Sequence, residues 1–254
     1  MANFYEVNGS NWVFISALSR TIPLYKRYFG DTANLVVNIG SGRNGESIAR
    51  LKDELSASNA VNFVANPAQV GVIEEATPGV TTIQAAIKDV AEETTFLQVQ
   101  SDYQDLRGAS TFYHYQLDRD RPEFYYHFSS ATIVPISVTT TTAAIALADA
   151  GFADTDVDFL RIMTNGWSYQ VLDGLGDKLD NVKAVQMQTE KFKAHPDHKS
   201  SALIADFMHA KGFALVDTGS EWGTPFQDQF WINTAKITTE EAVTDLYPAS
   251  VQAD

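Results

Sequence analysis

The chain contains no cysteine. This absence excludes disulfide bonds, thiolate nucleophiles and cysteine-ligated zinc. Long apolar runs are also missing: no stretch approaches the ~20 apolar residues that a membrane-spanning helix needs, and the most apolar one, 133–150, contains several threonines and Pro135. The first ten residues lack the charged, apolar and small-residue segments of a signal peptide. We therefore expect a cytoplasmic protein without a membrane partner.

Basic residues are scarce relative to acidic ones. The chain has 18 lysines and arginines against 32 aspartates and glutamates, which gives a formal charge of −14. Phosphate backbones and anionic membranes repel such a chain unless its basic residues are clustered, and the basic stretches here are short. The charge therefore argues against nucleic acid as a partner.

Short apolar runs alternate with amphipathic segments along most of the chain. The apolar runs predict strands at 35–40, 61–64, 80–87, 94–99, 125–128, 133–138, 159–163, 184–188, 213–216 and 229–233. The segments between them predict helices at 12–29 (bent at Pro23), 46–55, 142–150, 167–179 and 199–211, and one that begins at Pro67. This order predicts an α/β fold, a doubly wound, Rossmann-like and mostly parallel sheet that ends in a C-terminal antiparallel hairpin.

The length of 254 residues fits one large domain or two small ones, and the hydrophobic content of 44% is that of an ordinary globular protein. No internal repeat divides the chain, so we expect a single domain over 1–254. It would comprise an N-terminal helical segment (1–32), the Rossmann-like core (33–236) and a C-terminal tail (237–254). Five apolar side chains on its strands and inward helical faces are predicted to lie in the core: Ile39, Leu51, Leu160, Ile162 and Val185.

A glycine-rich loop lies between the first predicted strand of this core and the helix that follows it. Gly40, Gly42 and Gly45 have the G-x-G-x-x-G spacing of a nucleotide-binding turn. Glycine permits a positive φ and lets the backbone approach a ligand closely, while the helix N-terminus presents N–H groups. The loop therefore predicts a ligand pocket at the carboxyl ends of the strands; a plain tight turn is the alternative.

The residues around this loop supply amides where many nucleotide sites supply acids. A dinucleotide site needs an acidic residue at the end of the second strand to hold the ribose hydroxyls. Here that strand is followed by Asn66, and Asn38 lies near the end of the first strand. An amide donates and accepts hydrogen bonds but supplies no charge. The missing acid argues against a nicotinamide-dependent oxidoreductase.

Four segments follow one another in an ordered series: 36–42 (VVNIGSG), 63–67 (FVANP), 85–89 (AAIKD) and 157–166 (VDFLRIMTNG). The first resembles the first-strand motif of the FkbM family of S-adenosylmethionine-dependent methyltransferases, an acid followed by a Gly-Ala-Asn type of turn. The second is similar to that family's Phe-Glu-Pro-Asn-Pro motif, and the third to its Ala-Leu-Gly-Asp segment. The fourth resembles its Asp-Leu-Leu-Lys-Ile-Asp-Val-Glu-Gly motif.

The resemblance covers about residues 33–217. It implies a class I methyltransferase fold with S-adenosylmethionine as cofactor, held by six residues: Asn38, Gly40, Ser41, Gly42, Asn66 and Asn165. It also shows departures, because the acids of the family's motifs are replaced at Asn38, Val64, Met163 and Asn165. Losing a charged acceptor for the ribose costs about 1.5–3 kcal/mol per hydrogen bond.

Two hypotheses for the function remain open. The chain is an S-adenosylmethionine-dependent methyltransferase with a weakened cofactor site, which methylates a hydroxyl of a small molecule or glycan. Alternatively, it is a catalytically degenerate methyltransferase fold that serves as a binding or structural module. The glycine loop favours the first hypothesis and the missing acids favour the second.

The sequence assigns no catalytic residue. Five side chains are candidates for a base that removes the acceptor's proton: Asp102, Asp105, His114, His127 and Asp158. His114 and His127 lie in or beside a long aromatic loop.

Trp167 either caps the cofactor pocket or belongs to the core. His195 and His198 have no evident third ligand, so no metal is expected. The acceptor and the oligomeric state are not predicted.

Overall fold

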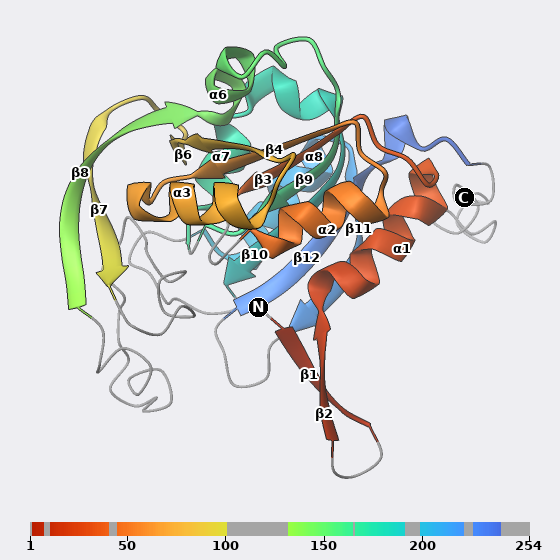
Figure 1. Ribbon diagram of the computed structural model, residues 1–254. Coiled ribbons are helices and arrows are strands. Elements are labelled where there is room, and N and C mark those ends of the chain that lie inside the picture. Colours follow the sequence, from red (N-terminus) through yellow and green to blue (C-terminus); the bar gives the residue numbers. More distant parts are fainter. Residues whose placement is uncertain are drawn as a thin grey trace.

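The computed structural model describes residues 2–7, 11–40, 45–100, 132–164, 166–190, 199–220 and 226–239. Its centre is a seven-stranded sheet with the spatial order β11-β12-β10-β9-β3-β4-β5 (Figure 1). The strands of this sheet are β3 (Leu35–Ile39), β4 (Asn59–Val64), β5 (Thr81–Gln84), β9 (Val157–Ile162), β10 (Val182–Glu190), β11 (Phe213–Ser220) and β12 (Phe226–Asn233). The predicted α/β class is confirmed.

One strand of the sheet runs against all the others. β3, β4, β5, β9 and β10 pair in parallel, whereas β12 is antiparallel to both β10 and β11. The expected C-terminal hairpin is therefore present. Its last strand lies between β10 and β11 rather than at the edge, and this order is that of the class I methyltransferase fold.

Helices cover both faces of the sheet. α1 (Ala17–Phe29) and α2 (Glu46–Glu54) pack with Val36, Phe159 and Phe230 on one face. The other face packs against α6 (Ala143–Asp149), α7 (Ser168–Asp173) and α8 (Ser201–Ala210). Neighbouring residues of a strand point to opposite faces, so Leu35 and Val37 belong to the second layer while Val36 belongs to the first. All five predicted core residues are buried.

Side-chain caps fix where several helices begin. α3 (Pro67–Ala76) starts with proline after Asn66, whose side chain accepts a hydrogen bond from the backbone N–H of Ala68. Thr142 and Ser200 cap α6 and α8 in the same way. These oxygens satisfy N–H groups that have no partner within the helix.

Among the described residues, two smaller β structures lie outside the main sheet (Figure 1). β1 (Ala2–Val7) and β2 (Asn11–Ser16) form an antiparallel hairpin that precedes α1. β6 (Ala86–Lys88), β8 (Thr132–Thr142) and β7 (Glu93–Gln100) form a three-stranded sheet. Phe96 and Val138 of this sheet pack with Ala65, at the carboxyl end of β4. The β7–β8 arm is therefore anchored at that edge of the main sheet.

Three predicted elements differ from the observed ones. Residues 12–16 are strand and not helix, because their aromatic and β-branched side chains favour extended backbone. The predicted strand 80–87 is two strands, and Ala85 between them donates its N–H to Val64 O.

The predicted helix 167–179 divides into α7 and the 3₁₀ helix η1 (Gly176–Asn181). The division occurs at Gly174, where a Cβ would lie 2.4 Å from Lys88 O. The last element among the described residues is a second 3₁₀ helix, η2 (Thr234–Lys236). No described helix is long and apolar enough to cross a membrane. The predicted strand at 125–128 and the aromatic loop lie outside the described residues.

Candidate functional site

The carboxyl ends of the parallel strands meet at one edge of the main sheet, hereafter the carboxyl edge. Ligands of open α/β sheets bind at this edge. Five chain segments contribute to it: the turn after β3, Asn66 after β4, the Lys88–Asp89 segment after β6, the β9–α7 connection and the end of β10. Of the residues predicted from the sequence, Gly40 and Asn66 lie in these segments, and Asn38 lies within β3, two residues before Gly40.

Gly40 starts the turn after β3 and has a φ of +83°. Its N–H donates to Phe63 O at 3.1 Å, while Met163 N–H donates to the preceding residue, Ile39, at 2.8 Å. A Cβ on Gly40 would lie 2.5 Å from Met163 O. Glycine is therefore required here both by the positive φ and by the close approach of the β9–α7 connection.

Gly45 ends the described part of the glycine loop and precedes α2 with a φ of +74°. A Cβ there would lie 2.8 Å from Ile73 and 2.9 Å from Thr77, both in or after α3. The third glycine of the motif thus serves close packing between α2 and α3. Ser41 and Gly42, predicted to hold the cofactor, lie outside the described residues, as does Asn165.

Asn38 is fully buried on the face covered by α1 and α2. Its Nδ2 donates to Asn62 Oδ1 at 2.8 Å, and its Oδ1 accepts from Arg161 Nη1 at 2.9 Å. The amide is thus engaged by neighbouring strands. Direct contact between the Asn38 side chain and a cofactor stays a prediction.

Asn66 combines a capping role with a contact to the β7–β8 arm. Its Oδ1 accepts from Ala68 N at 3.1 Å and from Gln98 Nε2 of β7 at 2.6 Å. Both Asn66 and Gln98 are buried. The oxygen of Asn66 is therefore occupied within the protein. Val64, where the family has its ribose-holding glutamate, is only 2% exposed and packs as an apolar strand residue.

Asp89 is a carboxylate of the carboxyl edge that was not included among the predicted site residues. It follows β6 and matches the acid of the family's Ala-Leu-Gly-Asp segment. Its Oδ1 is buried and has no hydrogen-bond partner in the described part of the chain. A buried carboxylate oxygen without a donor is costly, so this atom is the clearest candidate for a ligand contact. The matching segment was the sequence signal that could have found it.

Lys88 brings the Asp89 segment to the β9–α7 connection. Its Nζ pairs with Glu92 and lies 5.1 Å from the centre of the Trp167 ring. The backbone N–H of Trp167 donates to Thr164 O, and Ser168 Oγ donates to Gln188 O near the end of β10. Trp167 is buried, as its core alternative predicts. Thr164 Oγ1, in the same connection, is buried without a partner among the described residues.

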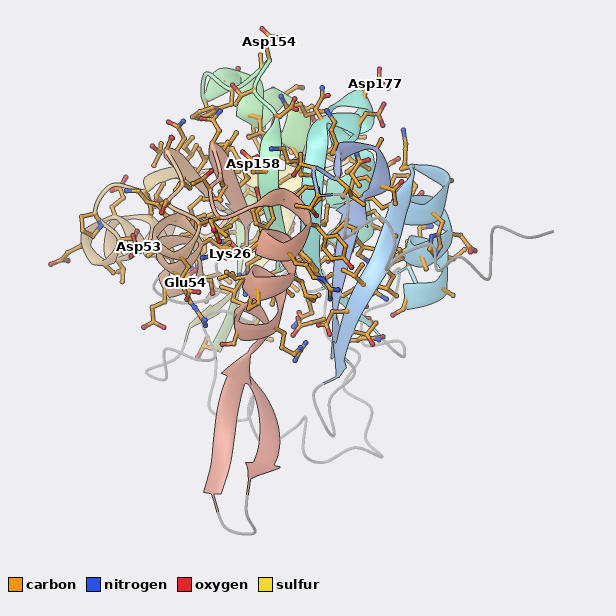
Figure 2. All side chains as sticks on the ribbon, turned by 90° about the vertical axis from the view of Figure 1, so that its right-hand side faces the viewer. Lys26, Asp53, Glu54, Asp154, Asp158 and Asp177 are labelled. Carbon is orange, nitrogen blue, oxygen red and sulfur yellow. The ribbon has the colours of Figure 1, made fainter. Side chains whose placement is uncertain are left out.

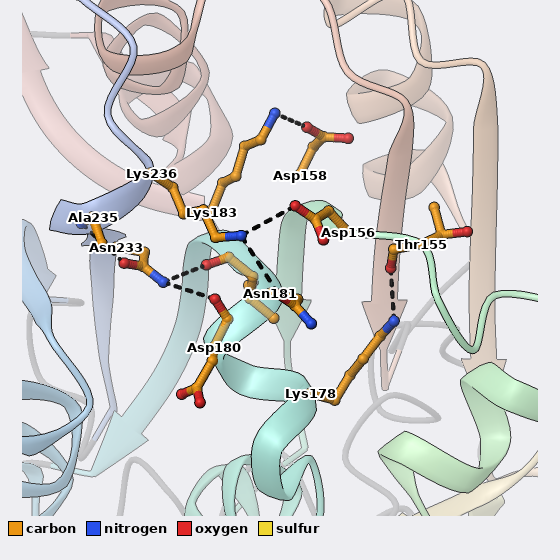
Figure 3. Close-up of polar contacts among 11 residues, drawn as sticks. Thr155, Asp156, Asp158, Lys178, Asp180, Asn181, Lys183, Asn233, Ala235 and Lys236 are labelled. Atoms are coloured by element: carbon orange, nitrogen blue, oxygen red, sulfur yellow. Dashed lines mark hydrogen bonds and ion pairs between the residues drawn. The ribbon is translucent and has the colours of Figure 1, made fainter.

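Asp158 lies at the opposite, amino edge of the sheet, near the start of β9. Its Oδ2 accepts the backbone N–H groups of Asn34 and Leu35 at 2.7 and 2.9 Å. Its Oδ1 pairs with Lys183 Nζ at 2.6 Å (Figure 3). Burial, together with the negative charge of Asp158, raises the pKa of the Tyr25 hydroxyl. Asp158 is therefore a structural anchor for the start of β3, and not a base at the carboxyl edge.

Further contacts hold the amino edge together (Figure 3). Lys178 Nζ donates to the backbone oxygens of Phe152, Ala153 and Thr155 at 2.7–3.0 Å. Lys236 pairs with Asp156 at 3.2 Å. Figure 2 shows Asp154 and Asp177 pointing outward at this end of the molecule, whereas Asp158 lies within it. These contacts join the loops and strand ends of the amino edge to one another.

The other predicted bases, Asp102, Asp105, His114 and His127, lie outside the described residues, as do His195 and His198. Within the described ranges, no three histidine or acidic side chains are grouped so that they could hold a metal ion. The described ranges therefore add no catalytic base or metal ligand to the sequence analysis.

The model of the methyltransferase FkbM domain matches residues 38–215. The match starts in β3 and ends in β11, so it covers most of the main sheet. The chain belongs to the FkbM methyltransferase family. The cofactor of this family is S-adenosylmethionine. Comparison with curated proteins finds no relative of significant sequence similarity.

Solved structures of methyltransferases are similar to this chain at low sequence identity. TrmK of M. capricolum, in complex with S-adenosyl-homocysteine, has 9% identity and a TM-score of 0.44, with 89% of this chain and 71% of that chain covered. The magnesium protoporphyrin IX methyltransferase of Synechocystis PCC 6803, with bound SAM, has 10% identity and a TM-score of 0.41, with 80% and 71% covered. A SAM-dependent methyltransferase of Aquifex aeolicus has 8% identity and a TM-score of 0.43, with 86% and 90% covered.

At the carboxyl edge, the described residues fit S-adenosylmethionine better at Asp89 than at the end of β4. Asp89 offers a buried acceptor atom with no partner in the described ranges. At the end of β4, in contrast, Val64 is apolar and the Asn66 oxygen is already engaged. The site thus retains one acid of the family's pattern and lacks the acid at the second strand.

Proposed function

We propose that this protein is an S-adenosylmethionine-dependent methyltransferase that methylates a hydroxyl of a small molecule or glycan. The observation that carries the proposal is the buried, unpartnered Oδ1 of Asp89 at the carboxyl edge of a family-typical sheet. A buried acceptor oxygen of this kind is stabilised when a ligand brings an N–H donor to it.

Asp89 would accept a hydrogen bond from the exocyclic amine of the adenine ring. The turn that starts at Gly40 would hold the methionine end, because its backbone can approach a ligand closely. Bound S-adenosylmethionine supplies an electrophilic methyl group. The part of the protein is to place the acceptor hydroxyl in line with that group and to exclude water, which is the main source of rate in such a transfer.

The acceptor class is supported by charge. A formal charge of −14 disfavours a nucleic acid acceptor, because a phosphate backbone is attracted by clustered basic side chains. The β7–β8 arm, anchored at the carboxyl edge through Phe96 and Gln98, would contribute to acceptor binding. We expect no change in fluorescence polarisation when labelled transfer RNA is mixed with the protein at physiological salt.

The second candidate is a methyltransferase fold without catalysis that serves as a binding or structural module. It is favoured by the engaged oxygen of Asn66 and by the apolar Val64, which together leave the ribose without a charged acceptor at β4. The two candidates differ in whether the carboxyl edge binds the cofactor.

Calorimetric titration with S-adenosylmethionine separates the candidates. We expect binding by the wild type, and binding about 5-fold weaker by Asp89→Asn, because a hydrogen bond to a neutral acceptor is weaker by about 1 kcal/mol than one to a carboxylate. Asp154→Asn is the matched control: it makes the same change of charge at an exposed position of the amino edge (Figure 2) and should leave affinity unchanged. A flat titration for the wild type would support the non-catalytic module.

A further inference from the structure

Gln170 lies in the first turn of α7, at the carboxyl edge of the main sheet. It is 8% exposed. Its Oε1 is buried and has no hydrogen-bond partner among the described residues. A buried acceptor oxygen without a donor destabilises the folded protein. Gln170 is therefore a candidate for contact with a ligand that brings a donor.

The start of α7 gives this oxygen no donor. Gln170 is the third residue after the N-cap, Trp167, and in a capping box the side chain at this position accepts the backbone N–H of the N-cap residue. Here the backbone N–H of Trp167 donates to Thr164 O at 2.8 Å instead. Lys88, which lies over the Trp167 ring, pairs with Glu92. A capping role therefore does not account for Gln170.

The packing of Gly174 makes Gln170 and Asp89 neighbours. A Cβ on Gly174 would lie 3.2 Å from Gln170 O and also 3.2 Å from the Cα of Asp89. The same Cβ would lie 2.4 Å from Lys88 O, so α7 packs directly against the end of β6 (Figure 1). Trp167 and Gly174 are three residues before and four residues after Gln170, and thus on the same helical face. Since both contact the segment 88–89, Gln170 lies between two contacts to it.

Two buried acceptor oxygens thus belong to one contact between α7 and the end of β6. Gln170 Oε1 and Asp89 Oδ1 both have no partner in the described part of the chain. Neither oxygen can satisfy the other, because an amide oxygen and an ionised carboxylate oxygen only accept hydrogen bonds. A ligand that satisfies both must bring two donors to the same place. An amino group on an aromatic ring does this, since its two N–H groups diverge in the plane of the ring.

We propose that Gln170 is a specificity-determining residue, which accepts one N–H of the exocyclic amine of adenine while Asp89 accepts the other. This role rests on the proposed function and adds the chemistry by which the site selects its base. A guanine or hypoxanthine ring has a carbonyl oxygen in place of the amine and would bring no donor to the two oxygens. Sites with buried hydrogen-bonding groups reject analogues that leave those groups unpaired. The two acceptors therefore select a cofactor whose adenine has a free amine.

Calorimetric titration of Gln170→Met with two ligands tests this role. Methionine is similar in size and removes the acceptor oxygen, so affinity for S-adenosyl-homocysteine should weaken about 5-fold, the loss of one hydrogen bond. Affinity for the deamino analogue, in which hydrogen replaces the exocyclic amine, should not weaken, because this ligand has no N–H for Gln170 to accept. The Tm of the ligand-free protein should not fall, because the substitution removes an unpaired buried oxygen.

Gln186→Met is the matched control. Gln186 is also buried with an Oε1 that has no partner among the described residues. It lies in β10 on the face of Ala184, which packs with α1 and α2 and not with α7. This variant should leave both affinities unchanged. If Gln170→Met does not fold, Gln170→Leu makes the same test.

The wild type adds a measurement that does not depend on any variant. It should bind the deamino analogue about 50-fold more weakly than S-adenosyl-homocysteine, because two hydrogen bonds are lost. Equal wild-type affinity for the two ligands, or an equal loss of both affinities in Gln170→Met, would overturn the role of Gln170. Unchanged affinity for S-adenosyl-homocysteine in folded Gln170→Met would overturn it as well, while the proposed function stands. If the wild type binds no S-adenosyl-homocysteine, the proposed function fails and the role of Gln170 fails with it.

Discussion

At the scale of single residues, Gln186 of β10 lies on the face of the main sheet that is covered by α1 and α2. It is fully buried, and neither its Nε2 nor its Oε1 has a hydrogen-bond partner in the described part of the chain. An unpaired buried amide costs about 1–3 kcal/mol. We therefore expect Gln186→Leu, of similar size, to raise Tm in thermal unfolding by a few degrees.

Gln229→Leu provides the matched control for this substitution. Gln229 is also buried, but its Oε1 accepts the indole N–H of Trp231 at 3.1 Å. The same change there leaves the indole donor unpaired and should lower Tm. A lower Tm for Gln186→Leu as well would contradict the assignment of Gln186 as unsatisfied.

The roles of individual polar residues follow from the sequence only in part. Asn38 and Asn66 were placed at strand ends from the local apolar pattern, and both lie there. Their partners could not be predicted, because Arg161 is 123 residues away in the chain and Gln98 is 32 residues away. Asp89 was recognised as part of a family-like segment, yet its unpaired oxygen depends on tertiary packing.

At the scale of elements, the glycine turn after β3 makes a prediction that separates backbone strain from packing. Gly30 and Gly40 have similar φ values, +89° and +83°. A Cβ on Gly30 would meet no atom within 4 Å, whereas one on Gly40 would lie 2.5 Å from Met163 O. Gly30→Ala should therefore lower the free energy of unfolding by about 1–2 kcal/mol, which is the cost of an L-residue in the left-handed backbone conformation.

Gly40→Ala must also displace the β9–α7 connection. It should therefore lower the free energy of unfolding by about 1–3 kcal/mol more than Gly30→Ala does. The measurement is denaturant unfolding of both variants beside the wild type. Equal losses for the two variants would show that the close approach of Met163 to Gly40 is not a constraint.

Most strands and helices could be predicted from apolar periodicity, and the exceptions have local causes. The apolar runs at 35–40 and 159–163 predicted buried strands, and β3 and β9 lie there. Such strands are apolar along most of their length because both faces of the sheet are covered. Residues 12–16 were assigned to a helix because the pattern of α1 starts directly after them. The end of α7 was missed because it depends on contact between Gly174 and Lys88, which lie far apart in the sequence.

At the scale of the whole molecule, the two edges of the sheet have different roles. The amino edge contains Asp158, Lys183, Lys178 and Lys236, all engaged in ion pairs or in hydrogen bonds to backbone oxygens (Figure 3). The carboxyl edge contains the glycine turn, Asp89 and the anchor of the β7–β8 arm. The sequence predicted a terminal hairpin, but the insertion of β12 beside β10 involves pairing between distant segments and has no local pattern.

A crystal structure with S-adenosyl-homocysteine tests the central claim most directly, because this demethylated product of the cofactor keeps its adenine, ribose and homocysteine groups. We expect the molecule at the carboxyl edge, with its exocyclic amine within hydrogen-bonding distance of Asp89 Oδ1 and its homocysteine end against the turn that starts at Gly40. Binding at another surface, or an adenine ring that leaves Asp89 Oδ1 unpaired, would contradict the account.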